Sequence, residues 1–248
     1  MKILLSPAKT LDFRSKITTE KTSELYFNKQ ADQLNEVLKK KSPKQLKQLM
    51  SISDKLADLN WQRNQEWEQA EQRQAIYAFK GDVYVGLDAY TIDKKYFDYL
   101  QQSVRLLSGQ YGLLKPFDSI KPYRLEMGTN LKIGKKKNLY EFWGSQITDK
   151  INEELAEKEV VVNLASHEYY NVIKPDVINA RIITPVFKDY LNGKLKFISF
   201  YGKKARGLMT RFAIDNKISN VEDIKTFNVQ NYAYDASLST EDEWVFTR

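Results

Sequence analysis

Basic and hydroxyl side chains follow the apolar runs of this chain in a pattern suited to binding an anion. Lys9 lies in the proline-bounded loop after KILLS, and Tyr111 lies in a glycine-containing loop after VRLLS. From Lys203 to Ile214 basic and apolar residues recur at helical spacing, which predicts an amphipathic helix with lysines at its positive N-terminal end. Gly207 would leave a gap beside these cations for the anion. The cations expected at the site are Lys9, Lys203, Lys204, Arg206 and Arg211; an ordinary solvated helix face is the alternative.

Three carboxylates accompany these cations and are candidates for acid–base chemistry on a bound nucleic acid. They are Asp118, Glu126 and Glu168. For the first two we favour the alternative of a structural salt bridge with Arg124. His167 follows a buried run, but no nucleophile accompanies it, so we interpret it as structural or peripheral. The sequence therefore leaves the catalytic residues unknown.

Residues 46–57, LKQLMSISDKLA, have the spacing of a helix-hairpin-helix element, which holds a DNA backbone. In the usual form two small positions are glycine, so that backbone N–H groups can approach a phosphate. Here Ser51 and Ser53 take those positions around Ile52, and Lys55 follows. Serine resists the positive φ that glycine tolerates, yet its hydroxyl favours the cap of the second helix. We expect these four residues to contact DNA; an αα-hairpin that only fills a core is the alternative.

Composition excludes several classes of function. The 248 residues include no cysteine and one histidine, which excludes thiolate catalysis, iron–sulfur clusters and cysteine zinc sites, and we expect no metal and no cofactor. The 39 Lys+Arg against 32 Asp+Glu give a net charge of +7, which suits an anionic partner but is not diagnostic. No run approaches the roughly 20 apolar residues of a membrane span, and MKILLSPAK is too short for a secretory signal. We expect a cytoplasmic protein with no membrane partner.

Six short apolar runs between helical stretches predict an α/β fold with one mixed sheet surrounded by helices. The dipeptide Asn192-Gly193 favours an antiparallel hairpin, whereas ligands gather at the carboxyl ends of parallel strands. Residues 20–75 lack glycine and have helical spacing, which predicts an inserted helical segment containing the hairpin. We expect one compact domain over residues 1–248. The predicted strands are residues 2–6, 75–79, 104–108, 160–165, 180–187 and 196–200.

Five ordered motifs extend along most of the chain: SPAKTLDF, AFKGDVYVGLDA, LSGQYGLLKPFDSIKPYRLEMGT, NLASHEYY and KKARGLMTRF. Together they resemble the YaaA family of bacterial peroxide-stress proteins. The resemblance implies a single α/β domain of unusual topology, a basic cleft, a helix-hairpin-helix, and binding to distorted DNA such as bends or junctions. It also implies a cytoplasmic role in limiting damage by hydrogen peroxide, linked to low unincorporated iron. The chain departs from the family pattern at Lys115 and Asn171, where arginine and lysine are expected.

Three functions remain open from the sequence. The first is a monomeric, sequence-tolerant DNA-binding protein that grips backbone phosphates through the hairpin and the basic cleft. The second is a nucleic-acid-processing enzyme, such as a glycosylase or a nuclease, that uses the same cleft. The third is an iron-homeostasis protein or a binder of a small anionic ligand, although no acidic cluster with ligand spacing stands out.

Overall fold

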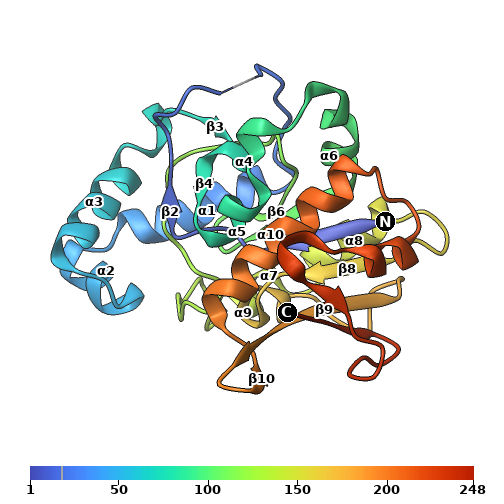
Figure 1. The fold of residues 1–248 in the computed structure, drawn as a ribbon. Helices are drawn as coiled ribbons and strands as arrows, with labels where there is room; N and C mark the ends of the chain where they lie inside the picture. The colour runs from blue at the N-terminus through green and yellow to red at the C-terminus, as the bar shows by residue number, and fades with distance from the viewer. Residues whose placement is uncertain (18) are drawn as a thin grey trace.

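Parallel strands form the middle of a mixed sheet. The computed structural model describes residues 1–17 and 19–248, and Figure 1 shows the sheet with helices around it. The parallel strands, in their order across the sheet, are β5 (Val104–Ser108), β1 (Lys2–Leu5), β8 (Val161–Leu164), β9 (Ile182–Leu191) and β12 (Glu243–Thr247). The carboxyl ends of these strands therefore share one edge of the sheet.

Antiparallel strands complete the sheet. β6 (Gly112–Leu114) pairs with β5, β10 (Lys194–Lys196) pairs with β9, and β11 (Ala233–Tyr234) pairs with β12. The eight-stranded sheet is thus mixed, which confirms the predicted fold class of a single compact α/β domain. Successive residues Ile3, Leu4 and Leu5 face opposite sides of β1 and are all fully buried, so helices and loops cover both faces of the central strands.

The remaining strands are short pairs outside the main sheet. β2 (Thr10–Leu11) pairs with β4 (Phe79–Lys80), and β3 (Arg73–Gln74) pairs with β7 (Ser119–Ile120). The β2–β4 pair holds the loop after β1 next to the segment that leads into α5 (Asp82–Leu87). This pairing brings two loops that are far apart in the sequence to the carboxyl edge of the sheet.

Helices connect the strands. In the part of the chain that the structure describes, no helix has the length and apolar character needed to cross a membrane. The helices other than α5 are α1 (Asn28–Lys39), α2 (Pro43–Met50), α3 (Asp54–Gln65), α4 (Ala75–Ala78), α6 (Phe97–Ser103), α7 (Leu139–Trp143), α8 (Gln146–Glu154), α9 (His167–Tyr170) and α10 (Ser199–Asp215). Short 3₁₀ turns cover residues 67–69, 89–91, 94–96, 221–226 and 229–231.

The helical segment predicted for residues 20–75 contains α1, α2 and α3, which Figure 1 shows projecting to one side of the sheet. α2 begins as its sequence predicts: the Ser42 hydroxyl accepts from the Gln45 N–H, the Gln45 side chain accepts from the Ser42 N–H, and Pro43 occupies the first turn. The cap of α3 is the Ser53 hydroxyl, which accepts from the Leu56 N–H. Residues 51–53 therefore form a short turn between two capped helices.

Two predicted strands are wrong in part. Residues 75–78 form α4, and only Phe79 of that run enters a strand. Every residue of this run is buried, so its apolar pattern has no period that separates a helix from a strand. In the run 196–200, β10 ends at Lys196 and α10 begins at Ser199. The sequence also missed β12, a short strand that follows a polar segment and pairs with the middle of β9.

The predicted hairpin at Asn192-Gly193 is confirmed. β9 and β10 pair antiparallel with Leu191 opposite Lys194, and the two turn residues have φ of 53° and 74°. Positive φ at both central positions is the type I′ geometry that matches the twist of the two strands. The turn therefore fixes the register of a hairpin that projects from the sheet beside the start of α10 (Figure 1).

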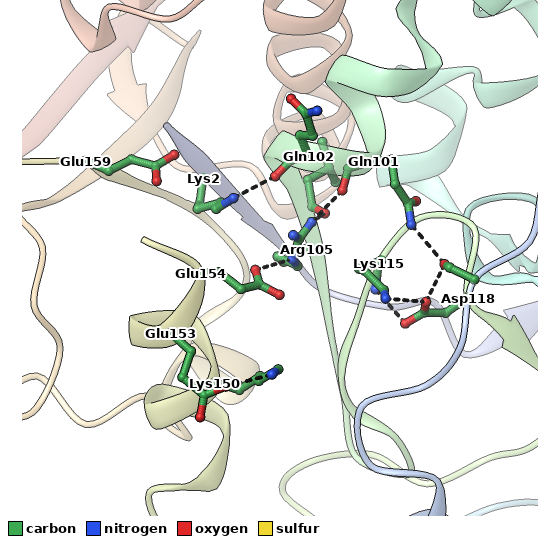
Figure 2. A network of polar contacts seen from close by, with 12 residues as sticks. Lys2, Gln101, Gln102, Arg105, Lys115, Asp118, Lys150, Glu153, Glu154 and Glu159 are labelled. Atoms are coloured by element: carbon green, nitrogen blue, oxygen red, sulfur yellow. Dashed lines mark hydrogen bonds and ion pairs between the residues drawn. The ribbon is translucent and has the colours of Figure 1, made fainter. Parts of the chain in front are cut away.

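A buried polar network ties β1 and β5 to their surroundings (Figure 2). Arg105 on β5 donates to the Glu154 carboxylate at 2.6 Å and to the carbonyls of Gln101 and Val104. Asp118, labelled in the same figure, is fully buried; it accepts from the Lys115 N–H at 2.9 Å and lies 3.7 Å from the Lys115 ammonium. Burial raises the pKa of Asp118 despite these partners.

Candidate functional site

A pocket of about 290 Å³ opens where β1 and β8 end. The hydroxyl of Ser6, directly after β1, accepts from the Ser166 N–H at 2.8 Å and lies 3.2 Å from the Ser166 hydroxyl, so the two strand ends are joined. The predicted convergence of strand-end loops is confirmed for these two strands. The lining comes from the loop after β1, the β4–α5 junction, α9 and α10: Ser6, Pro7, Ala8, Lys9, Thr10, Lys80, Gly81, Asp82, Val83, Tyr84, Ser166, Glu168, Tyr169, Lys203 and Arg206.

Arg206 is the most unusual residue of this pocket. Its side chain is half-buried, and burial lowers the pKa of its guanidinium below the usual range. Among the residues that the structure describes, no carboxylate contributes to this pKa, and its guanidinium forms no ion pair or hydrogen bond. A desolvated cation without a partner is costly, so the arrangement favours uptake of an anion. Lys203, three residues earlier on the same helix face, is exposed and adds a second positive charge to the lining.

Gly207 does not provide the gap that the sequence suggested. A Cβ placed on Gly207 would lie 1.8 Å from the Val83 carbonyl oxygen, and one on Gly86 would lie 2.2 Å from the Lys204 carbonyl oxygen. The two glycines let α10 and α5 touch backbone to backbone. The lysines also lie more than one turn inside α10, which begins at Ser199, so the N-terminal dipole contributes little at their positions.

Lys9 enters the pocket from the loop after β1, and its ammonium lies 2.5 Å from the Glu126 carboxylate. The other oxygen of Glu126 accepts from Arg124 at 3.1 Å, so the predicted Arg124 salt bridge is confirmed with this partner. Glu126 thus balances two cations at the rim of the pocket. Lys9 differs from Arg206 in having a carboxylate partner already.

Glu168 on α9 also lines the pocket. Its Oε1 accepts from the Gly128 N–H at 3.0 Å, and its carbonyl oxygen accepts from the Tyr140 hydroxyl at 2.7 Å. The pocket floor has two buried phenols: Tyr84 donates to the Ser6 carbonyl oxygen at 3.0 Å, and burial raises the pKa of both Tyr84 and Tyr169. Both phenols therefore stay protonated near neutral pH, where a hydroxyl can donate a hydrogen bond.

Several residues predicted for the cleft are absent from the lining of this pocket. Tyr111 is 2% exposed, and its hydroxyl accepts from the Lys121 N–H at 2.9 Å. Arg211 binds the Asp215 carboxylate at 2.8 Å and the Thr91 hydroxyl at 2.7 Å, which clamps α10 to the segment after α5. Asp118 belongs to the buried network of Figure 2, and Lys204 is half-buried on α10 outside the lining.

Sequence reasoning missed Lys80 and Tyr84 at this site. Both lie in the motif AFKGDVYVGLDA, but no periodicity within that motif indicates that the β2–β4 pair brings it beside Lys9. Ser6 ends the predicted strand 2–6, and Ser166 directly follows the predicted strand 160–165, so their place at strand ends was visible in the sequence. Among residues 1–17 and 19–248, no group of three or more histidine, aspartate or glutamate side chains is placed to hold a metal ion.

The turn between α2 and α3 is the second site expected from the sequence. Ser51 adopts the left-handed conformation with φ of 50°, so it takes up the backbone geometry for which glycine is usual. Ile52 is 8% exposed, while Ser53 and Lys55 are exposed. Lys47 on α2 lies 2.8 Å from the Asp54 carboxylate at the start of α3. A shallow groove beside the turn is lined by Pro43, Lys44, Lys47, Gln48, Ser51, Ile52, Asp54, Ala57 and Asp58.

Comparison with known proteins gives one consistent result. A family model described as "Peroxide stress protein YaaA" matches residues 1–238 of the chain. A UPF0246 protein of Flavobacterium johnsoniae is 50% identical over 252 residues, covering 100% of both chains. A second UPF0246 protein, from Flavobacterium psychrophilum, is 49% identical over 252 residues with the same full coverage.

Proposed function

Because the chain belongs to the peroxide stress protein YaaA family, we propose that it serves the oxidative stress response by binding DNA through backbone phosphates. The observation that carries this proposal is the unpaired, half-buried guanidinium of Arg206 in the strand-end pocket. A phosphodiester oxygen in that pocket would supply the missing partner of Arg206 and would lie close to Lys203. A charged hydrogen bond to arginine is also among the stronger polar contacts that a protein can make.

The α2–α3 turn is suited to bind a second phosphate of the same DNA. Ser51 holds the left-handed conformation of the turn, and the start of α3 presents backbone N–H groups that have no intrahelical partner. Lys55 is exposed on the first turn of α3. These groups are suited to bind a phosphate, although the phosphate must first break the ion pair between Lys47 and Asp54. Such contacts read no base, so the binding is sequence-tolerant.

The proposed preference for bent or junction DNA follows because the protein has two separate phosphate-binding sites, the strand-end pocket and the α2–α3 turn. The turn lies on the arm formed by α2 and α3, and the pocket lies at the edge of the sheet (Figure 1). Two phosphate sites fixed by one rigid body select duplexes whose backbone path fits both of them. Duplexes that are already bent reach both sites without the energy of deformation.

The test is DNA binding as a function of salt, by fluorescence anisotropy with linear, bent and four-way-junction DNA. Arg206→Gln should weaken binding to every DNA and reduce the slope of log K against log salt by about 1. Lys55→Glu combined with Lys203→Glu should abolish binding at moderate salt. The matched control is Lys94→Gln, an exposed lysine outside both sites, which should bind as wild type does. If affinity does not fall with salt, or if the double variant binds normally, the proposal is wrong.

A nucleic-acid-processing activity is the second candidate, because the Glu168 carboxylate lines the same pocket as Arg206. In such a reaction the carboxylate would serve as the acid or base for a nucleotide drawn into the pocket. Duplexes carrying uracil or an oxidised base, incubated with and without Mg²⁺, test this candidate. Base release or strand cleavage that is lost in Glu168→Gln would support it, and intact duplexes would remove it.

A further inference from the structure

A patch of exposed aromatic and apolar side chains covers the β9–β10 hairpin and the first turn of α10. Their exposed fractions range from 41% to 64%, whereas most large apolar side chains of this chain are buried. We call this set the hairpin patch; its members are Tyr190, Leu191, Phe197, Phe200 and Tyr201. Exposed apolar side chains gathered on neighbouring segments of a domain are typical of an interaction site.

Three aromatic rings of the hairpin patch contact neighbouring groups of the protein. The ring of Phe197 lies against Gly202 of α10, where a Cβ would come within 2.7 Å of it. Phe200 and Tyr201 meet edge to face with ring centroids 5.6 Å apart. The guanidinium of Arg248 lies over the Tyr201 ring, 4.7 Å from its centre. These three rings thus contact the protein on part of their surface and remain partly exposed.

The surroundings of the hairpin patch are strongly basic. Residues 188–206 include a single acid, Asp189, which is buried and lies 2.5 Å from the Arg248 guanidinium. Lys194 and Lys196 are exposed on β10, at the edge of the sheet. Lysines on an edge strand oppose pairing with a second copy of the same edge, and burying them against an apolar protein surface would be unfavourable. The same charges attract a polyanion.

The hairpin patch and the strand-end pocket are neighbours on α10. Phe200 and Lys203 are three residues apart on α10 and so share a helix face, and Lys203 lines the pocket with Arg206. Three helical residues span about 4.5 Å, a length on the order of one nucleotide step. A strand with one phosphate near Lys203 would therefore carry the next nucleotide over Phe200, while Arg206, six residues from Phe200 and about 9 Å away along the helix, would meet a phosphate farther along the strand.

We infer that the hairpin patch stacks against unpaired bases of a DNA strand whose phosphates occupy the pocket, an inference that rests on the proposed function. Every base offers an apolar face to an aromatic ring, so stacking adds affinity without reading sequence. Bases inside a continuous duplex are already stacked on one another and cannot use the patch. The preferred partner is consequently DNA with unpaired nucleotides, such as a gap, an overhang or an open junction.

The test compares a linear duplex, the same duplex with a short gap of unpaired thymines, and single-stranded oligothymidylate. Wild type should bind the gapped and single-stranded DNA more tightly than the linear duplex. The double variant Tyr190→Leu with Phe200→Leu, which keeps apolar surface but removes two rings, should lose at least about 10-fold in affinity for DNA with unpaired bases. Its affinity for the linear duplex should stay within about twofold of wild type. The matched control is Leu238→Ala, an apolar residue that is 40% exposed and outside the patch.

A spectroscopic variant separates stacking from a structural role. Phe200→Trp places an indole in the patch, and its emission should be quenched by oligothymidylate but not by the linear duplex, because only an unpaired base can stack on it. Absence of quenching would overturn the inference even if the double variant failed to fold.

The remaining outcomes are also decisive. If wild type binds no DNA at all, the proposed function fails together with this inference. If wild type binds duplex and gapped DNA, and the double variant binds each of them as tightly as wild type does, only the stacking is overturned. If the double variant instead abolishes a dimer in sedimentation, or binding to anionic phospholipid vesicles, while gapped-DNA affinity is unchanged, the hairpin patch is a self-interface or a membrane contact.

Discussion

Gly207→Ala should destabilise the protein and weaken the proposed DNA binding together. A methyl group at this position would lie 1.8 Å from the Val83 carbonyl oxygen and 2.7 Å from the Leu87 nitrogen, both of which are backbone atoms. Relief requires α5 and α10 to separate by about 1 Å or more, since Cβ contacts below 3.0 Å essentially never occur. Both helices line the strand-end pocket, so their separation would move Arg206 away from the β4–α5 side of it.

The magnitude follows from two opposing effects. Glycine to alanine inside a helix is favourable by about 1 kcal/mol in intrinsic propensity. Overpacking a closely fitted interface costs about 1–3 kcal/mol and occasionally more, and here the clash is with backbone that cannot rotate away. Because the clash is with backbone, the cost should lie at the upper end of that range, so we expect a net loss of up to about 2 kcal/mol in the free energy of unfolding, measured from urea denaturation midpoints.

Gly202→Ala is the matched control, because it lies in the same helix and gains the same propensity. Its methyl group would meet only the ring of Phe197, at 2.7 Å, and that side chain is 54% exposed and free to swing outward. Gly202→Ala should therefore be neutral or slightly stabilising. If the two variants have the same stability, the interpretation of α5 and α10 as a backbone-to-backbone contact is refuted.

Three further predictions concern charges. Asp54→Asn should raise the affinity for linear duplex DNA in anisotropy titrations, because it frees Lys47 and removes a negative charge from the start of α3. Backbone and hydroxyl donors lower the pKa of Asp12, so its contribution to stability is complete above the unfolded pKa and is lost as pH falls towards the folded pKa. In urea denaturation, Asp12→Asn should be less stable than wild type at pH 7, and the difference should be smaller at pH 3; a difference that does not shrink would contradict this. Arg105→Met should cost about 3–5 kcal/mol of stability by stranding the buried Glu154 carboxylate, and a smaller loss than in Glu154→Gln would contradict this.

The parts of the fold that the sequence predicted are those set by local chemistry. Asn192-Gly193 predicts a turn with two positive φ values, because the turn depends only on a few neighbouring residues. The runs at 2–6, 104–108 and 160–165 became strands for a similar reason, since each is short, apolar and bounded by polar residues. Residues 75–78 were predicted wrongly because every one of them is buried. A fully buried segment has no alternation of apolar and polar residues, so its sequence does not separate a helix from a strand.

The candidate site was predictable only where strand ends carry its residues. Lys9 and Glu168 follow strands whose parallel pairing with each other is a general expectation of α/β sheets. Lys80 reaches the pocket through the β2–β4 pair, a contact between segments far apart in the sequence that no local pattern encodes. Gly207 was misinterpreted for a related reason: from sequence alone, a glycine on a basic helix face looks like space for a ligand, whereas here the backbone of α5 fills that space.

The positions of the carboxylates indicate which of the two proposed phosphate sites would contribute more to the free energy of DNA binding. At the α2–α3 turn a phosphate must displace the Asp54 carboxylate from Lys47, so the electrostatic gain is an exchange of one anion for another. Arg206 has no such ion-paired carboxylate among the residues that the structure describes, so a phosphate there need not displace a partner from a partly desolvated cation. The pocket should then supply most of the binding free energy, while the turn should mainly orient the DNA. For this reason Arg206→Gln should weaken binding more than Lys55→Gln does, although Lys55 is the more exposed of the two cations.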